Sequence, residues 1–248
     1  MFEYSVFPPT FDRWLAAQAM RSGTSKYRLE LWRRACRPGT LVIDVGANIG
    51  AYTLVAATAV GRSGSVLAVE PRPDLAASLR TAIEHSGLEH VSVVEAAALE
   101  RSAPVRLRST RGHGGDQWIC PSAARGVTVR GVTIDELAIG PHSVSAVKID
   151  VQGAEGRVIE GMQDLLELHA SVEVFIEYWP AGLRRAGSNP RIAMDLLRRH
   201  QFSPLLIDAR GRRCVPVGER FFDRADRWRI RHADLLLTRN PDRWLQRR

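Results

Sequence analysis

Short runs of consecutive hydrophobic residues alternate along the chain with longer segments whose hydrophobic residues recur every three or four positions. The short runs are typical of strands covered on both faces of a parallel sheet, and the longer spacing is typical of helices. We expect core strands at residues 41–45, 65–69, 91–94, 143–149, 172–176, 204–207 and 233–237. A basic, aromatic connection joins the last two.

Helical patterns separate the earlier strands. The spacing predicts helices at residues 51–60, 73–86 and 190–200, and one helix that begins at Glu155 and continues through Leu166. This alternation of strand and helix predicts an α/β fold, a doubly wound, Rossmann-like sheet that is mostly parallel with an antiparallel edge strand.

Two stretches depart from the alternation. Residues 1–40 have helical spacing and end at Arg37-Pro38-Gly39, so we expect an N-terminal helical lead-in that packs on the sheet or forms a lid. Residues 104–130 contain short β-like pieces around a glycine-rich loop at 111–116, which indicates an inserted β arm near the mouth of a pocket. The rest of residues 41–248 is expected to form one domain.

Composition and charge exclude several classes of protein. The net charge of +8 could attract nucleic acid, but 33 of the 35 basic residues are arginine, a skew that resembles the codon bias of a GC-rich genome. Nucleic acid is therefore not the expected partner. Three widely spaced cysteines fit neither a disulfide framework nor a zinc cluster, so no metal site is predicted. No segment resembles a membrane span or a signal peptide, which favours a cytoplasmic protein.

The first strand runs directly into the turn Gly46-Ala47-Asn48-Ile49-Gly50, which opens the next helix. This turn lacks the middle glycine that a dinucleotide pyrophosphate requires. A ligand with ribose and adenine but no phosphate fits such a turn, and S-adenosylmethionine is the common example. We expect Asp44 to attract its ammonium group, and the backbone N–H groups of the turn, from Gly46 through Asn48 to Gly50, to receive its carboxylate.

Two further segments complete the expected cofactor site. Glu70 ends the second strand, about 20 residues after the turn, where an acidic side chain binds ribose hydroxyls. Ala97 and Ala98 follow the third strand, and their small side chains would leave room for an adenine ring. Ordinary loop packing is the alternative explanation for the two alanines.

Four motifs resemble the FkbM family of S-adenosylmethionine-dependent methyltransferases: DVGANIGAYT (44–53), VEP (69–71), VTIDEL (132–137) and KIDVQGAEGRVIEGM (148–162). The resemblance covers roughly residues 40–180. It implies a class I methyltransferase fold and methylation of a hydroxyl on a sugar, polyketide or other secondary metabolite. Gln152 stands where the family pattern has Glu, which removes one charge near the expected pocket.

Methyl transfer to a hydroxyl benefits from a base within hydrogen-bond reach of the acceptor. Asp150 at the end of the fourth strand, Glu155 about one turn later and His113 in the glycine-rich loop are the catalytic candidates. Helix capping is the alternative role for Asp150, and Glu155 could simply favour the positive end of its helix. Lys148 should form a structural ion pair with Asp150 or Asp44.

Three functions therefore remain open from the sequence. The main hypothesis is O-methylation of a small hydroxylated molecule. RNA or DNA methylation is the first alternative, although no motif of the N/D-P-P-Y/F type is present. A non-catalytic protein that binds S-adenosylmethionine is the second, favoured by Gln152. The sequence identifies neither the acceptor nor the oligomeric state, and leaves a homo-oligomer open.

Overall fold

A computed structural model describes residues 25–109, 117–119, 126–227 and 232–245. Its strands are β1 (Leu41–Val45), β2 (Ser65–Val69), β3 (Val91–Val94), β4 (Ala97–Ala98), β5 (Val105–Ser109), β6 (Gln117–Ile119), β7 (Val127–Val129), β8 (Gly131–Val132), β9 (Val144–Ile149), β10 (Glu173–Tyr178), β11 (Ser203–Asp208), β12 (Arg213–Pro216) and β13 (Ala233–Thr238). Its helices are α2 (Lys26–Ala35), α3 (Ala51–Val60), α4 (Pro73–His85), α5 (Ile134–Leu137), α6 (Glu155–Glu160), α7 (Gln163–Leu168), α8 (Pro180–Arg185), α9 (Pro190–Arg199), α10 (Glu219–Arg227) and the 3-10 turn η1 (Pro241–Arg243).

Eight strands form the main sheet in the order β12-β11-β13-β10-β9-β1-β2-β3. Five neighbouring strands of this sheet are mutually parallel: β10, β9, β1, β2 and β3. In contrast, β13 is antiparallel to both β10 and β11, and β12 is antiparallel to β11. The predicted fold class is confirmed. The antiparallel part is larger than a single edge strand, because β13 lies inside the sheet and β12 forms the edge.

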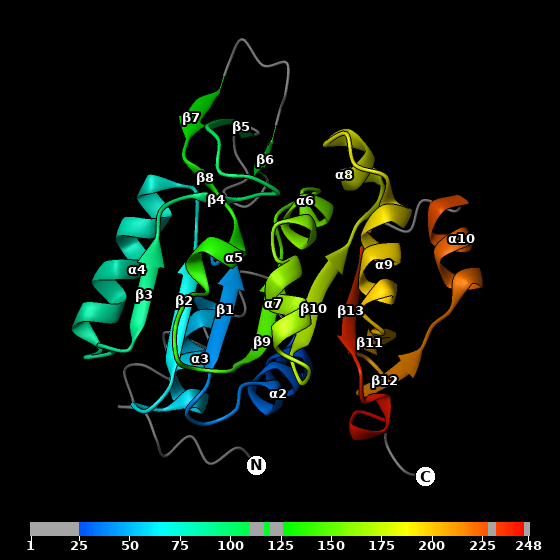
Figure 1. The fold of residues 1–248 in the computed structure, drawn as a ribbon, viewed down its shortest axis with the longest axis horizontal. Coiled ribbons are helices and arrows are strands. Elements are labelled where there is room, and N and C mark those ends of the chain that lie inside the picture. Colours follow the sequence, from blue (N-terminus) through cyan, green and yellow to red (C-terminus); the bar gives the residue numbers. More distant parts are fainter. Residues whose placement is uncertain (1–24, 110–116, 120–125, 228–231, 246–248) are drawn as a thin grey trace.

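Helices cover both faces of the sheet (Figure 1). One face packs against α6, α7, α8 and α9 through a cluster that includes Ile43, Ile149, Ile159 and Leu197. The other face packs against α2, α3 and α4 through a second cluster that includes Trp32. Because successive side chains of a strand point to opposite faces, β1 supplies hydrophobic residues to both clusters.

The helix α2 belongs to the expected N-terminal lead-in and lies against α3 and β9. Trp32 is fully buried, and its Nε1 donates a hydrogen bond to the carbonyl of Tyr52 at 3.0 Å. Its ring also makes an edge contact with Phe175 of β10 at a centroid distance of 5.3 Å. The part of the lead-in before residue 25 lies outside the described residues.

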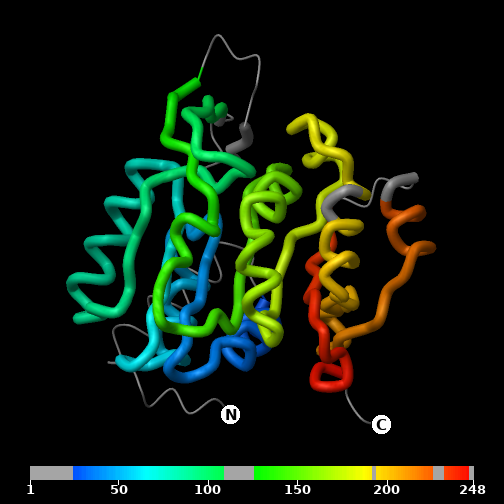
Figure 2. The backbone as a smooth tube through the Cα atoms, in the orientation of Figure 1, coloured from blue at the N-terminus to red at the C-terminus, as the bar shows by residue number. Residues whose placement is uncertain are grey.

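The segment expected as an inserted arm contains paired strands. β5 pairs with β6 and β7 in a three-stranded antiparallel sheet, and β4 pairs with β8 at its base. Figure 2 shows the arm rising beyond the end of the main sheet at which β1, β2 and β9 finish. The glycine-rich loop with His113 lies outside the described residues.

The prediction of one helix from Glu155 through Leu166 is wrong, because the chain forms the two short helices α6 and α7. Gly161 separates them, and a Cβ atom at this position would lie 1.9 Å from the carbonyl oxygen of Leu99. The carbonyl of Gly161 accepts hydrogen bonds from the backbone N–H groups of Ile134 and Asp135, which begin α5. The first residues of α5 therefore occupy the carbonyl of Gly161, which in a continuous helix would accept a hydrogen bond from a residue of the same helix.

Other elements were not predicted. The connection between β11 and β13, described from the sequence only as basic and aromatic, contains β12 and α10, and α8 follows β10 directly. The segment at Ala97 is a strand rather than a loop.

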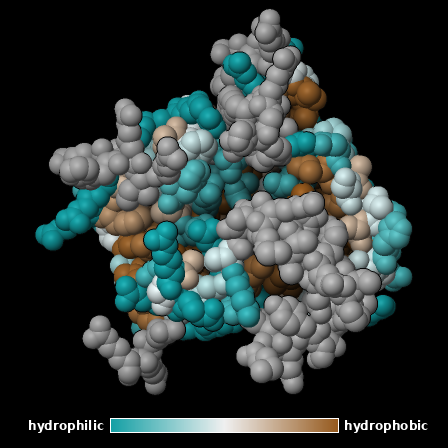
Figure 3. Space-filling view, turned by 180° about the vertical axis from the view of Figure 1, so that it is seen from behind, coloured by the Kyte–Doolittle hydropathy of each residue, from teal (hydrophilic) through white to brown (hydrophobic). Residues whose placement is uncertain are grey.

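Seen from behind, the surface of the described residues mixes hydrophilic and hydrophobic side chains (Figure 3). None of the helices in the described part of the chain is both long and apolar enough to cross a bilayer.

Candidate functional site

The turn after β1 is pressed against the end of β9. Gly46 has φ +77°, and a Cβ atom at this position would lie 2.0 Å from the backbone oxygen of Asp150. Asn48 and Gly50 also have positive φ angles, 52° and 86°. Only glycine satisfies both the left-handed conformation and the close approach at position 46. The turn is therefore shaped by two strand ends that are about 100 residues apart in sequence.

Hydrogen bonds fasten the same turn to the end of β2. The N–H groups of Gly46 and Ala47 donate to the carbonyl of Val69 at 2.9 and 3.2 Å. The N–H group of Asn48 donates to Oε2 of Glu70 at 2.8 Å. These three N–H groups, which were expected to receive a ligand carboxylate, are thus already bonded within the protein.

Glu70 lies where the ribose-binding carboxylate was predicted, directly after β2. Its side chain is buried, and Oε1 accepts a second backbone hydrogen bond, from the N–H group of Arg72 at 3.0 Å. Burial raises the pKa of Glu70, although the two backbone donors oppose that shift. A carboxylate oxygen can accept more than one hydrogen bond, so each oxygen of Glu70 retains capacity for a ligand hydroxyl.

Asp44 and Lys148 form a buried ion pair between β1 and β9, as predicted. The Lys148 Nζ lies 3.3 Å from Oδ1 of Asp44 and 3.5 Å from Oδ2 of Asp150. Thr53 donates a hydrogen bond to the other oxygen of Asp44 at 2.7 Å. Burial lowers the pKa of Lys148, but the charges of Asp44 and Asp150 outweigh burial and raise it. Lys148 therefore remains charged, and the ion pair lies buried beneath the turn.

Gln152 links two carboxylates at the ends of neighbouring strands. Its Nε2 donates to Oδ1 of Asp150 at 3.0 Å and to Oε2 of Glu177 at 3.1 Å. Burial, followed by the nearby charges of Asp150 and Asp234, raises the pKa of Glu177 to about 8. The amide that departs from the family pattern thus lies between two acidic groups and donates to both.

His232 also lies at this edge and was not among the predicted site residues. Its Nδ1 is 3.2 Å from Oε1 of Glu177, and its ring stacks on Trp179 at a centroid distance of 4.9 Å and an angle of 30°. The sequence contained a usable signal. An antiparallel strand that begins at Ala233 starts at the edge where the parallel strands end, so the residue before it belongs to that edge.

Glu155 is fully buried and binds the backbone of the preceding turn. Its Oε1 accepts hydrogen bonds from the N–H groups of Val151 at 3.3 Å and Gly153 at 3.0 Å. Burial raises its pKa to about 7. Its second oxygen has no partner among the described residues. This geometry supports a role in shaping the Asp150–Gly153 turn.

Ala97 and Ala98 contribute little accessible surface, since each is only 4% exposed. Their strand β4 pairs with β8, and Ala98 packs in the main core. The structure therefore places these two residues inside the protein fold, as the alternative of ordinary packing expects.

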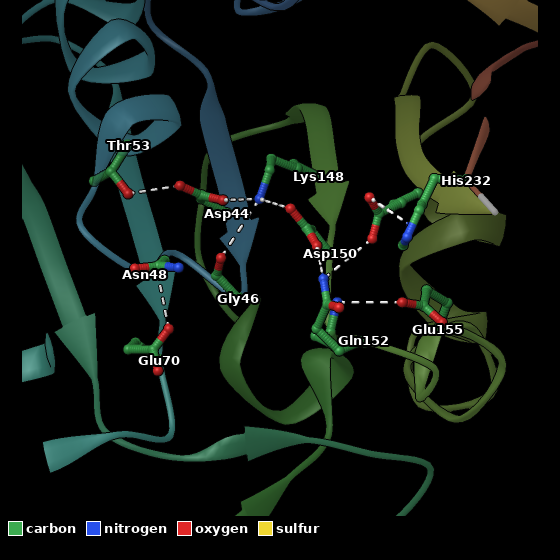
Figure 4. Close-up of polar contacts among 12 residues, drawn as sticks. Asp44, Gly46, Asn48, Thr53, Glu70, Lys148, Asp150, Gln152, Glu155 and His232 are labelled. Atoms are coloured by element: carbon green, nitrogen blue, oxygen red, sulfur yellow. Dashed lines mark hydrogen bonds and ion pairs between the residues drawn. The ribbon is translucent and has the colours of Figure 1, made fainter. Parts of the chain in front are cut away.

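Figure 4 shows the polar groups of the site as a row in two parts. Glu70 is bonded to Asn48 in one part, and in the other a chain of contacts runs from Thr53 and Asp44 through Lys148 and Asp150 to Gln152, with His232 beyond it. The row follows the edge at which the parallel strands end, where ligands bind in open α/β sheets. Its left part offers hydrogen-bond acceptors suited to a ribose, and its right part offers groups that bind or move a proton.

The site lies within a part of the chain that matches a known protein family. A family model described as Methyltransferase FkbM domain matches residues 44–204. The structure resembles a methyltransferase FkbM from Methylobacillus flagellatus KT at 15% identity and a TM-score of 0.52, covering 85% of this chain and 50% of the other. This chain therefore spans half the length of that structure. An rRNA-methylase candidate from Clostridium thermocellum is similar at 11% identity and a TM-score of 0.51, with 85% and 92% coverage. No curated protein matches the sequence.

Proposed function

Because this chain belongs to the FkbM methyltransferase family, we propose that it transfers the methyl group of S-adenosylmethionine to a hydroxyl of a small molecule. One observation carries the proposal. The family match spans the turn at Gly46, the carboxylate of Glu70 and the Asp150 edge, and these features lie along one end of the sheet.

The residues at the turn fit this methyl donor. Glu70 presents a buried carboxylate with acceptor capacity for the two ribose hydroxyls. The Asp44 and Lys148 charges lie beneath the turn and compensate each other, so this pair places no uncompensated charge beneath the methionine end of the donor. When bound, S-adenosylmethionine supplies an electrophilic methyl group on a positively charged sulfur.

The groups beyond the turn support a hydroxyl acceptor. A hydroxyl must lose its proton as it is methylated, and Asp150, Glu177 and His232 lie together at the edge of the sheet. Asp150 is the most accessible of the predicted catalytic residues described by the structure, with 37% of its side chain exposed. The acceptor class is a sugar, a polyketide or another secondary metabolite, as the family resemblance implies.

Cofactor binding provides the first test. Calorimetry with S-adenosylmethionine and S-adenosylhomocysteine should show binding to the unmodified chain. Glu70→Ala should weaken it by about 10- to 100-fold, because the variant loses the ribose acceptor and the hydrogen bond that holds Asn48. Glu95→Ala is the matched control, since Glu95 is a partly exposed carboxylate paired with Arg80 at 3.2 Å.

The acceptor is then identified with a labelled methyl donor and a panel of hydroxylated sugars and polyketides. Mass spectrometry should locate the new methyl group on oxygen. Absence of binding to both ligands contradicts the proposal. Transfer to RNA together with salt-sensitive retention on heparin would instead support a nucleic acid methyltransferase.

A further inference from the structure

His232 reaches the functional edge because of the direction of β13. This strand is antiparallel to β10, so its first residues lie beside the last ones of β10, with Ala233 opposite Tyr178 and Asp234 opposite Glu177. His232 immediately precedes this pairing, and 43% of its side chain is exposed. The imidazole therefore borders both the acidic groups and the space in front of the sheet edge.

Neighbouring side chains fix the imidazole in one orientation. The Trp179 ring stacks on one side, and the Arg185 guanidinium lies 4.7 Å from the centroid of the Trp179 ring. Nδ1 faces Oε1 of Glu177 at 3.2 Å. In a neutral imidazole one nitrogen carries the proton and the other accepts, so a proton on Nδ1 leaves a lone pair on Nε2. Nε2 has no hydrogen-bond partner among the residues that the structure describes.

The carboxylates at this edge are already engaged. Glu177 interacts with Gln152 through one oxygen and with His232 through the other. Asp150 interacts with Gln152 through one oxygen and with Lys148 through the other. Nε2 of His232 is thus a proton acceptor on a partly exposed side chain that the described protein groups do not engage, whereas the second oxygen of Glu155, which also has no partner among them, is fully buried.

We propose that His232 is the general base of the methyl transfer and that Glu177 is its positioning residue. This inference rests on the proposed function. In the step, the acceptor oxygen forms a bond to the methyl carbon, the carbon–sulfur bond breaks, and its electron pair remains on sulfur. The hydroxyl proton passes to Nε2 of His232. Glu177 lies 3.2 Å from Nδ1 and stabilises the resulting imidazolium in its ionised form, which its raised pKa of about 8 makes the main form only at higher pH. Water later removes that proton. The arrangement follows the logic by which a carboxylate orients a catalytic histidine in hydrolases.

The kinetic test compares His232→Gln with His85→Gln, a control at an exposed histidine on α4. With the acceptor found by the labelled-methyl screen, His232→Gln should lower kcat by about 10²- to 10⁴-fold, the usual contribution of a general base. Its KM and its affinity for S-adenosylhomocysteine should stay within about twofold of the unmodified chain, a difference below 0.5 kcal/mol. Added imidazole should restore part of the activity of His232→Ala, which a purely structural role would not predict.

A second measurement requires no acceptor. Nitrogen NMR of the full chain with S-adenosylhomocysteine should show neutral His232 with its proton on Nδ1, and Glu177→Gln should reduce the population of that tautomer. A proton on Nε2, or full activity of His232→Gln, would overturn the inference while leaving the proposed function intact. Failure of the unmodified chain to bind either cofactor form would instead refute the proposed function.

Discussion

At the scale of single residues, the site depends on charges that the sheet holds out of water. Register places Asp44 directly opposite Lys148 on neighbouring strands, and the two side chains meet at 3.3 Å. A buried pair of this kind contributes little net stability, because the loss of hydration offsets the attraction between the charges. Removing one partner is costly, since the other charge remains buried alone.

Lys148→Met should therefore lower the free energy of unfolding by about 3–5 kcal/mol, because it leaves Asp44 buried with Thr53 as its remaining polar partner among the described residues. The double variant Asp44→Asn/Lys148→Met removes both charges and should recover at least half of that loss. Urea unfolding of the two variants measures the difference. Equal destabilisation of both would show that the pair is not charge-coupled.

Because the pKa of Glu155 is raised in the folded chain, this residue should make the free energy of unfolding fall as the pH rises. Its pKa is about 7 in the folded chain, against 4.5 for an ordinary glutamate. Between these values the unfolded chain releases a proton that the folded chain keeps, so stability falls as the pH rises, by up to about 3 kcal/mol. Glu155→Gln cannot ionise and should show a smaller fall in Tm between pH 5 and pH 7.5. A Tm profile parallel to that of the unmodified chain would contradict this.

The sequence predicted some of these residues and not others, for a physical reason. Glu70 follows from a strand end that is read locally, and the need of Lys148 for an acidic partner follows from its place within a mainly apolar strand. The bridge by Gln152 and the position of His232 depend on which strands are neighbours and on the direction of β13. Local hydrophobic spacing carries no such information.

At the scale of elements, glycines occupy positions where two segments approach too closely for a side chain, as at Gly46 and Gly161. The first five predicted strands match because each is mainly apolar, whereas the break between α6 and α7 involves the distant N–H groups of Ile134 and Asp135, which bond the carbonyl of Gly161. A helical spacing of hydrophobic residues persists across such a break, so the pattern alone could not detect it. The turn after β1 has a close approach of the same kind, between Gly46 and the backbone of Asp150, and a substitution there tests its importance.

Gly46→Ala should destabilise the fold by about 3 kcal/mol or more and abolish cofactor binding, since the new Cβ would collide with the backbone of Asp150. Gly87→Ala is the matched control. Gly87 has φ +62°, but a Cβ atom added there would have nothing within 4 Å, so only the conformational cost of about 1 kcal/mol should appear. Thermal unfolding and calorimetry of both variants separate the two effects. Similar losses in both would show that the contact with Asp150 is unimportant.

At the scale of the whole molecule, the two ends of the sheet have different tasks. β10 carries a glutamate at each end, Glu173 at the start and Glu177 near the finish. Glu177 belongs to the polar row of the functional edge. Glu173 is buried at the opposite end, where Oε1 accepts a hydrogen bond from Nε1 of Trp244 at 3.0 Å and lies 3.5 Å from Arg243. The segment after β13 therefore closes the end of the sheet remote from the ligand.

Trp244→Phe should consequently reduce stability without affecting the site. The variant keeps an aromatic ring near Phe175 but removes the donor to Glu173, which costs about 1–3 kcal/mol for a buried acceptor. Burial already raises the pKa of Glu173, and loss of the Trp244 donor should raise it further. Urea unfolding should show the loss, while the Kd for S-adenosylhomocysteine stays within about twofold of the unmodified chain. A weakened Kd would mean that the two ends are coupled through β10, and the separation of tasks would then be wrong.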